Sequence, residues 1–241
     1  MRILIVRHAE PDYAHNTLTE KGFKEAELLA ERMKKIKIDD LYSSPQGRAV
    51  KTAEVSAEKI HKEFKVLDWL TEFEGKIIDD EEKRIPWNLL PQFWTDRNKL
   101  YNIYTWLEDS VMSCDNVSKC QSMVNNGFDN LLGYYGYQRK GIIYECEENI
   151  DKTIVLFCHF GLGMLLVSRL TGISPVLLWQ TMFMPTSSVT TFVTEEREKG
   201  EVVFKCMQLG DTSHLYAADE PISKSGLYAE FFGGEGCGPL V

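Results

Sequence analysis

The sequence opens with Arg2-Ile3-Leu4-Ile5-Val6, and Arg7-His8-Ala9-Glu10 follows without a break. Four consecutive branched apolar residues are typical of a buried strand. Open α/β sheets bind ligands beyond the carboxyl ends of their strands, so we expect this Arg-His pair to lie at a ligand crevice. A histidine there can act as nucleophile or base, and a neighbouring guanidinium can hold a phosphoryl group in fork geometry.

Length and composition are those of an ordinary globular protein. The chain has 241 residues, of which 44% are hydrophobic and 26% charged, enough for one large or two small domains with a buried core. No apolar run approaches the roughly 20 residues of a membrane span. Met1 leads directly into the predicted strand, which argues against a signal peptide. We therefore expect a cytoplasmic protein.

Cysteine usage and net charge narrow the classes of ligand. The six cysteines are scattered without a CxxC pair or metal-ligand spacing, which favours free thiols and predicts neither a metal nor another cofactor. A net charge of −9 argues against nucleic acid or an anionic membrane as partner. A local cationic pocket for a small anion is compatible with it. Oligomeric state is left open.

Strands and helices alternate along the chain, which predicts an α/β fold: a three-layer α/β/α sandwich with a mixed, mainly parallel sheet. Strands are predicted at 2–6, 40–43, 64–67 and 153–158, and an antiparallel pair at 187–194 and 201–209. Helices are predicted at about 19–37, 44–61, 117–135 and 160–172, and a short one from residue 175.

Local signals mark the helix starts. Thr19 is the predicted N-cap of the first helix, and Ser44-Pro45 are predicted as the N-cap and first residue of the second. The spacing of apolar residues predicts one buried face on the first helix: Phe23, Ala26, Leu29, Ala30, Met33 and Ile36.

We interpret residues 1–241 as a single domain with one insertion. Residues of about 75–115 are rich in Trp, Asp, Asn and Pro and break the alternation, so they are predicted to form an inserted lid. The glycine-rich tail at about 230–241 is expected to be mobile. Aromatic and cationic side chains of the lid suit an organic phosphate, although packing is the simpler interpretation of each: Arg84, Trp87, Trp94, Arg97 and Tyr101.

Two further strand ends carry cationic groups. Arg48 lies about one turn into the second predicted helix, whose N-terminus attracts anions. His159 follows an apolar strand, and the amides of Phe160 and Gly161 can face an anion there while a protonated His159 adds charge. Together with Arg7, these groups predict an anion pocket at three strand-to-helix junctions.

At these positions the chain resembles the histidine phosphatase, or phosphoglycerate-mutase-like, superfamily. Arg7-His8-Ala9-Glu10 is similar to its RHG(E) signature, and residues 44–53 match SPxxRAxxTA at each fixed position. Leu70-Thr71-Glu72 is similar to the LxE segment that bears the proton donor, and residues 158–161 resemble the late (S/T)HGG element. The order and spacing agree over roughly residues 1–75 and 150–195.

The resemblance implies the chemistry of the site. His8 would attack a small phosphomonoester and form a phosphohistidine that water then hydrolyses, without a metal. The phosphoryl oxygens would be held by Arg7, Arg48 and His159. Glu72 would protonate the leaving oxygen and later activate water, with Glu74 as an alternative acid on the same predicted face. Physical chemistry adds two expectations: a backbone carbonyl should accept from the other ring nitrogen of His8, and the acid should have a raised pKa.

The departures from the family pattern leave other functions open. Ala9 replaces a common glycine, Phe160 replaces the first glycine of HGG, and the Trp-Asn pair of the mutases is missing. A phosphoglycerate-type phosphomutase, against which the missing Trp-Asn pair argues, is the second interpretation, and a catalytically weak phosphate- or phosphoprotein-binding protein is the third. Asn16 and His214 are further candidates for substrate contact; a turn residue and surface packing are the respective alternatives.

Overall fold

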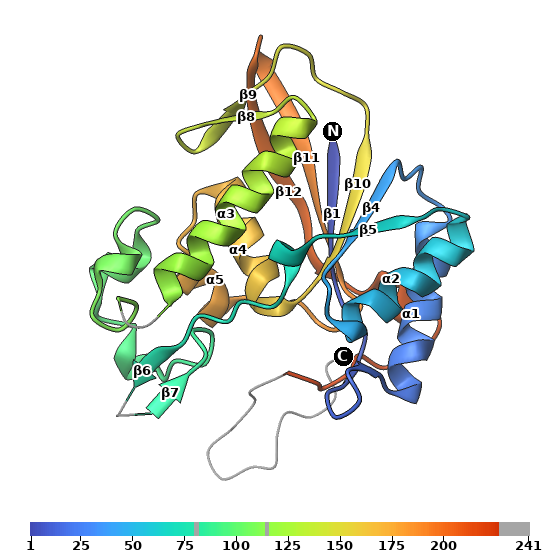
Figure 1. Ribbon diagram of the computed structural model, residues 1–241, viewed down its shortest axis with the longest axis horizontal. Coiled ribbons are helices and arrows are strands. Elements are labelled where there is room, and N and C mark those ends of the chain that lie inside the picture. The colour runs from blue at the N-terminus through green and yellow to red at the C-terminus, as the bar shows by residue number, and fades with distance from the viewer. Residues whose placement is uncertain (80–81, 114–115, 227–241) are drawn as a thin grey trace.

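A mixed eight-stranded sheet forms the centre of the molecule (Figure 1). The computed structural model describes residues 1–79, 82–113 and 116–226. In spatial order the strands are β5 (Phe64–Val66), β4 (Asp40–Ser43), β10 (Thr153–Cys158), β1 (Arg2–Arg7), β11 (Val189–Glu198), β12 (Glu201–Asp211), β9 (Ile143–Glu145) and β8 (Gln138–Lys140). The first four are parallel, and from β1 onward each strand is antiparallel to its neighbour. Within this sheet β11 and β9 run against the other strands, so the mixed, mainly parallel prediction is confirmed.

Helices cover both faces of the sheet. On one face lie α1 (Glu20–Met33) and α2 (Gly47–Ile60); on the other lie α3 (Val117–Tyr134), α4 (Phe160–Thr171) and α5 (Pro175–Thr181) (Figure 1). The short α6 (Ser213–Tyr216) packs against α1. The predicted three-layer sandwich is therefore confirmed. None of the helices in the described ranges combines the length and apolar character needed to cross a membrane.

The opening strand explains why the sheet has two cores. Successive side chains of a strand point to opposite faces. Ile3 and Ile5 join the core beneath α3, α4 and α5, whereas Leu4 and Val6 join the core beneath α1 and α2. All four are buried, so the uninterrupted apolar run reflects a strand covered on both faces.

Two local predictions about the helix starts have different outcomes. Thr19 caps α1 as predicted, because its hydroxyl oxygen accepts from the Gly22 amide at 3.0 Å. The prediction for Ser44-Pro45 is wrong: α2 begins at Gly47, and Gln46 is its N-cap. Ser44 remains extended beside β10, where its amide donates to the Phe157 carbonyl at 2.9 Å.

The buried face of α1 also differs from the prediction. Phe23 is 40% exposed, and the buried residues of the helix are Gly22, Glu25, Ala26, Leu29, Ala30 and Met33. The stripe therefore passes through Glu25 instead of Phe23. The helix also ends at Met33, before Ile36.

The segment of residues 75–115 joins the main core. It contains the hairpin β6–β7 (Ile77–Asp79 and Glu82–Arg84) and short 3₁₀ helices. Leu100, Trp106 and Met112 are buried in the core beneath α3, α4 and α5. A role for this segment as a lid stays a prediction, and the tail predicted to be mobile at 230–241 lies outside the described residues.

Small paired strands were not predicted from the sequence. They are β8 and β9, β6 and β7, and the pair β2 (Pro11–Asp12) and β3 (Thr17–Leu18). Their two- and three-residue lengths give too little alternation to detect.

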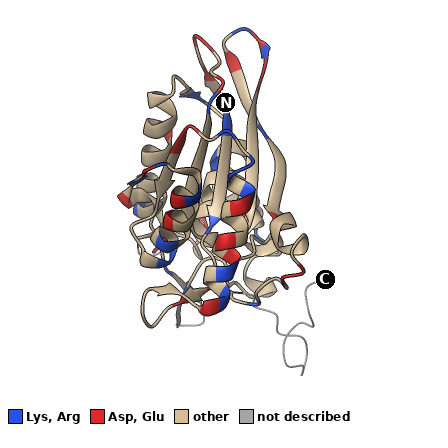
Figure 2. Cartoon of the chain, turned by 90° about the vertical axis from the view of Figure 1, so that its right-hand side faces the viewer, with Lys and Arg blue, Asp and Glu red and all other residues tan. Residues whose placement is uncertain are grey.

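On the outer face of α1 and α2, Figure 2 shows acidic and basic residues intermixed, with ion pairs such as Lys51–Glu54 at 2.7 Å.

Candidate active site

The pairing of β1, β10 and β4 brings three strand ends together. Arg7 is in register with Cys158, and Phe157 is in register with Ser43. The residues after these strands therefore meet at the carboxyl ends of the parallel strands. The His8 and His159 ring centroids lie 5.1 Å apart, as the sequence predicts for groups at neighbouring carboxyl ends.

His8 has one ring nitrogen free to act as a nucleophile. Its Nδ1 lies 2.7 Å from the Ala9 carbonyl oxygen, which can only accept, so Nδ1 carries the proton and Nε2 presents a lone pair. Arg48 Nε donates to this Nε2 at 3.2 Å. Burial, together with Arg7 and Arg48, holds the pKa of His8 well below its usual value. The imidazole is therefore neutral and reactive at Nε2.

The two arginines approach His8 from different elements. Arg7 is 3% exposed and donates from Nη1 to the Met184 carbonyl at 2.7 Å, whereas its Nε is buried without a hydrogen-bond partner among the described residues. Arg48 donates from Nη2 to Gln46 Oε1 at 2.7 Å and faces the Tyr13 ring at 5.4 Å. An unsatisfied buried guanidinium nitrogen is costly unless a ligand accepts from it.

His159 is neutral in this structure, which corrects the expectation that it is protonated. It is fully buried, and burial with His8, Arg48 and Arg7 nearby holds its pKa well below the usual value. Its Nε2 lies 2.7 Å from Ser44 Oγ, and its Nδ1 is buried without a described partner. A phosphate dianion beside the ring would favour the charged form.

Glu72 occupies the N-terminus of α4. Its Oε1 accepts from the Leu162 amide at 2.9 Å, and its Oε2 accepts from the Gly161 amide at 3.3 Å. The expectation that the Gly161 amide faces a bound anion is thus wrong, because a carboxylate of the chain already takes it. Burial raises the pKa of Glu72, against the opposing effect of these amides and Arg48.

Glu74 does not share the position of Glu72. Residues 71–76 form neither strand nor helix, so the two side chains diverge, and Glu74 is exposed whereas Glu72 is half-buried. The expectation that both point to one face is therefore wrong. Of the two carboxylates, Glu72 is the one whose charge interacts with Arg7 and Arg48.

Asn16 and His214 support loops of the site. Asn16 is exposed, and its Oδ1 accepts from the Gly47 amide at the start of α2 at 3.1 Å. His214 is buried, which is contrary to the surface alternative, and its Nε2 lies 3.2 Å from Ser187 Oγ. Burial lowers the pKa of His214 to about 4. The Ser187 amide in turn donates to the His8 carbonyl at 3.1 Å.

Sequence reasoning missed two residues that connect the site. Gln46 Oε1 accepts from Arg48 and, at 3.4 Å, from the Glu72 amide, which links the Arg48 side chain to the segment that carries Glu72. Thr52 Oγ1 accepts from the Ala9 amide at 3.0 Å and donates to the Arg48 carbonyl at 2.8 Å. Thr52 occupies a fixed position of SPxxRAxxTA, which was a usable signal; Gln46 occupies a variable one.

A third missed residue, Glu25, lies beneath the loop that follows His8. It is fully buried and accepts from the Glu10 amide at 2.9 Å and from the Thr186 hydroxyl at 3.1 Å. Burial raises its pKa to about 7, with Lys21 opposing and the Glu10 carboxylate reinforcing the change. Glu25 therefore keeps its proton in the folded state over a range in which an exposed glutamate is ionised.

Because of this raised pKa, the contribution of Glu25 to stability falls as pH rises from 4.5 to about 7. The lowered pKa values of His8, His159 and His214 act in the opposite direction, so the effect of Glu25 is isolated by comparing variants. In that window the unfolded chain releases the Glu25 proton that the folded chain retains, so rising pH favours unfolding. The full loss is about 3 kcal/mol, from about 1.4 kcal/mol per pKa unit. Between pH 4.5 and pH 8 in urea unfolding, Glu25→Gln should therefore gain stability relative to wild type by about this amount. Glu27→Gln, an exposed change on the same helix, should keep the wild-type pH dependence; the same pH dependence in wild type and Glu25→Gln would refute the assignment.

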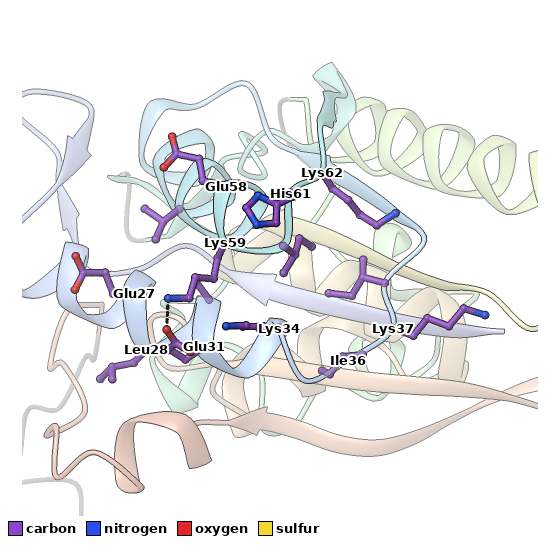
Figure 3. A pocket seen from close by; sticks show the side chains of 14 residues that line it. Glu27, Leu28, Glu31, Lys34, Ile36, Lys37, Glu58, Lys59, His61 and Lys62 are labelled. Atoms are coloured by element: carbon purple, nitrogen blue, oxygen red, sulfur yellow. Dashed lines mark ion pairs between the residues drawn. The ribbon is translucent and has the colours of Figure 1, made fainter.

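A groove between α1 and α2 lies away from these groups (Figure 3). Its lining includes the C-terminal ends of both helices and residues 36–38. These residues precede β4 and so lie at the amino end of that strand, whereas the His8 site lies at the carboxyl ends. Both acidic and basic side chains line it, and Lys59 forms an ion pair with Glu31. The groove is therefore not part of the His8 site.

A neutral histidine beside one buried and one half-buried guanidinium group, at the strand ends of an α/β sandwich, is suited to binding a phosphoryl group. The family model of the histidine phosphatase superfamily (branch 1) matches residues 3–104. Over these residues, which include His8, Arg48 and Glu72, the chain is similar to the histidine phosphatase superfamily.

Two curated proteins are similar to the chain in sequence. The chain is 26% identical over 218 residues to a putative phosphoserine phosphatase 2 of Hydrogenobacter thermophilus, covering 84% of this chain and 94% of the relative. It is 37% identical over 70 residues to a 2,3-bisphosphoglycerate-dependent phosphoglycerate mutase of Thermoplasma acidophilum, covering 25% of this chain and 35% of that protein.

Two solved structures share the fold. A phosphoserine phosphatase of Entamoeba histolytica, in complex with 3-phosphoglyceric acid, has a TM-score of 0.56 at 20% identity and covers 89% of this chain and 98% of its own. A mycobacterial glucosyl-3-phosphoglycerate phosphatase in complex with VO3 has a TM-score of 0.56 at 18% identity, and the match covers 88% of this chain and 99% of that protein.

Proposed function

We propose that the protein is a metal-independent phosphatase that hydrolyses a small organic phosphomonoester through a phosphohistidine on His8. The observation that carries this proposal is the hydrogen bonding of the imidazole. Nδ1–H is committed to the Ala9 carbonyl, and the Nε2 lone pair lies against Arg48. A nucleophilic nitrogen is thus paired with a group suited to the phosphoryl oxygens.

The first chemical step follows from these contacts. His8 Nε2 attacks phosphorus, and the bond from phosphorus to the ester oxygen breaks in line with it. Arg48 exchanges its contact with Nε2 for the phosphoryl oxygens, and the free Nε of Arg7 supplies a second donor. Because phosphoryl transfer depends chiefly on charge stabilisation at these oxygens, two guanidinium groups supply the main catalytic effect. The Ala9 carbonyl stabilises the proton on Nδ1 as the ring gains positive charge.

Glu72 supplies the proton for the leaving oxygen. Its raised pKa favours the protonated form, and the three backbone amides that contact it, those of Phe73, Gly161 and Leu162, fix its orientation. After the alcohol departs, the carboxylate accepts a proton from water as that water attacks the phosphohistidine. Inorganic phosphate leaves, and both His8 and Glu72 regain their starting states.

Phosphate release from a panel of phosphomonoesters tests the proposal. We expect free phosphate without any added acceptor, at a rate unchanged by a chelator. Transfer chiefly to added phosphoglycerate would instead identify a phosphomutase. Tight phosphate binding without release from any ester would identify a binding protein.

A further inference from the structure

Three aromatic rings, those of Phe160, Phe183 and Trp87, form a row beside Arg7, which we call the aromatic wall. The Arg7 guanidinium carbon lies 5.8 Å from the Phe160 ring centroid and 5.4 Å from that of Phe183. Phe160 meets Trp87 edge-on, with 6.2 Å between the ring centroids. A continuous row of rings therefore extends from a phosphate-binding group into the segment inserted before α3.

The first turn of α4 contacts both Glu72 and this aromatic wall. The Gly161 amide donates to Glu72 Oε2. On the same residue, a β-carbon would lie 2.2 Å from the Trp87 ring, so glycine is what permits this approach. If Glu72 protonates the leaving oxygen as proposed above, the atoms of the leaving group beyond that oxygen lie on the side of Gly161 that faces Trp87.

The Trp87 ring is held by its neighbours and keeps part of its surface free, whereas Phe160 is 8% exposed and supports it. Trp87 packs on Trp179 with 6.3 Å between centroids, and the Trp179 indole donates to the Gly161 carbonyl at 2.9 Å. Phe160 and Phe183 lie 5.4 Å apart. Trp87 and Phe183 are only half-buried. Rigid, partly exposed rings of this kind bind apolar ligand surface without a large ordering cost.

We propose that the enzyme prefers phosphomonoesters whose leaving group carries an aromatic or other planar apolar moiety. This inference rests on the proposed phosphatase function and specifies its substrate class. An aromatic leaving group buries apolar area against the two rings. A compact charged alcohol, such as the serine of phosphoserine, would instead lose hydration of its charges there without gaining this contact.

A matched pair of substrates isolates the contribution of the ring. In 2-phenylethyl phosphate and ethyl phosphate the leaving oxygen belongs to a primary alcohol, so protonation by Glu72 is needed to a similar extent. We expect kcat/KM for the phenylethyl ester to exceed that for the ethyl ester by at least about tenfold, the scale of apolar-pocket discrimination. Phosphoserine should resemble ethyl phosphate or be poorer.

Variants locate the preference on the wall. Trp87→Leu should reduce the phenylethyl-to-ethyl ratio by roughly fivefold, since it exchanges an indole for a smaller apolar side chain. Trp94→Leu, the same change at another half-buried tryptophan of the same segment, should keep the wild-type ratio. Phe160→Leu should also lower the phenylethyl-to-ethyl ratio, and it serves as the test variant if Trp87→Leu does not fold.

The outcomes separate the two proposals. Equal kcat/KM values for the paired esters, or a preference for phosphoserine, would overturn the aromatic preference and leave the phosphatase function standing. A preference for the phenylethyl ester that persists in both wall variants would also overturn it. No phosphate release from any ester, including para-nitrophenyl phosphate, would refute the proposed function itself.

Discussion

His8→Ala is expected to abolish turnover, with kcat reduced by about four orders of magnitude or more, as typically follows loss of a nucleophile. His159, the neighbouring imidazole, cannot replace it, because its Nε2 is engaged with Ser44 Oγ and its ring lies 5.1 Å away, centroid to centroid. Two quantities are measured: phosphate release from the best ester of the panel, and the amount of acid-labile, base-stable phosphoprotein after rapid quenching in base. The variant should form no phosphohistidine.

The fold should survive this change, and a matched histidine substitution tests for indirect effects. His61 lies at the end of α2 in the left-handed conformation, so His61→Asn removes an imidazole with little backbone strain. This control should retain wild-type activity. Circular dichroism should show the same secondary structure for wild type and His8→Ala, and His8→Gln repeats the test with a smaller cavity. A His8 variant that folds and keeps more than about one per cent of the wild-type rate would refute the nucleophile assignment.

The strand ends could be predicted from the sequence because the signals there are local. An apolar run that ends in Arg7-His8, and another that ends at His159, predict buried strands and the positions of their next residues. Because β1 and β10 are adjacent and parallel, His8 and His159 then lie at the same end of the sheet. The same logic placed Arg48, although the predicted cap at Ser44 was two residues early because that residue remains extended beside β10.

The rest of the site depends on tertiary contacts that no local pattern encodes. The neutral state of His159 results from burial among cationic groups supplied by β1 and α2. Glu25 is part of a helical stripe that sequence periodicity assigned to apolar residues; its burial is tolerated because two hydrogen-bond donors reach it. Gln46 acts through contacts to two separate elements, and neither its type nor its spacing predicts them.

Glu72→Gln is expected to slow hydrolysis of alkyl phosphates by about 10²–10⁴-fold, the usual contribution of a general acid. The glutamine oxygen can still accept from the Leu162 amide as Oε1 does, although its NH2 group cannot accept from the Gly161 amide as Oε2 does. The variant thus keeps the shape of the side chain and loses the transferable proton together with one contact to α4. With para-nitrophenyl phosphate, formation of the phosphohistidine should slow by less than about tenfold, because nitrophenolate departs without protonation.

The second half of the reaction distinguishes an acid from a residue that merely orients α4. If Glu72 also activates water, phosphohistidine should accumulate in Glu72→Gln, with a burst of nitrophenolate followed by slow release of phosphate. Rapid-quench labelling measures both steps. Glu74→Gln, two residues away on an exposed side chain, should change neither step substantially. An inactive Glu74→Gln beside an unaffected Glu72→Gln would transfer the acid role to Glu74. Equal losses on alkyl and nitrophenyl esters, without accumulation of phosphohistidine, would instead limit Glu72 to positioning the N-terminus of α4.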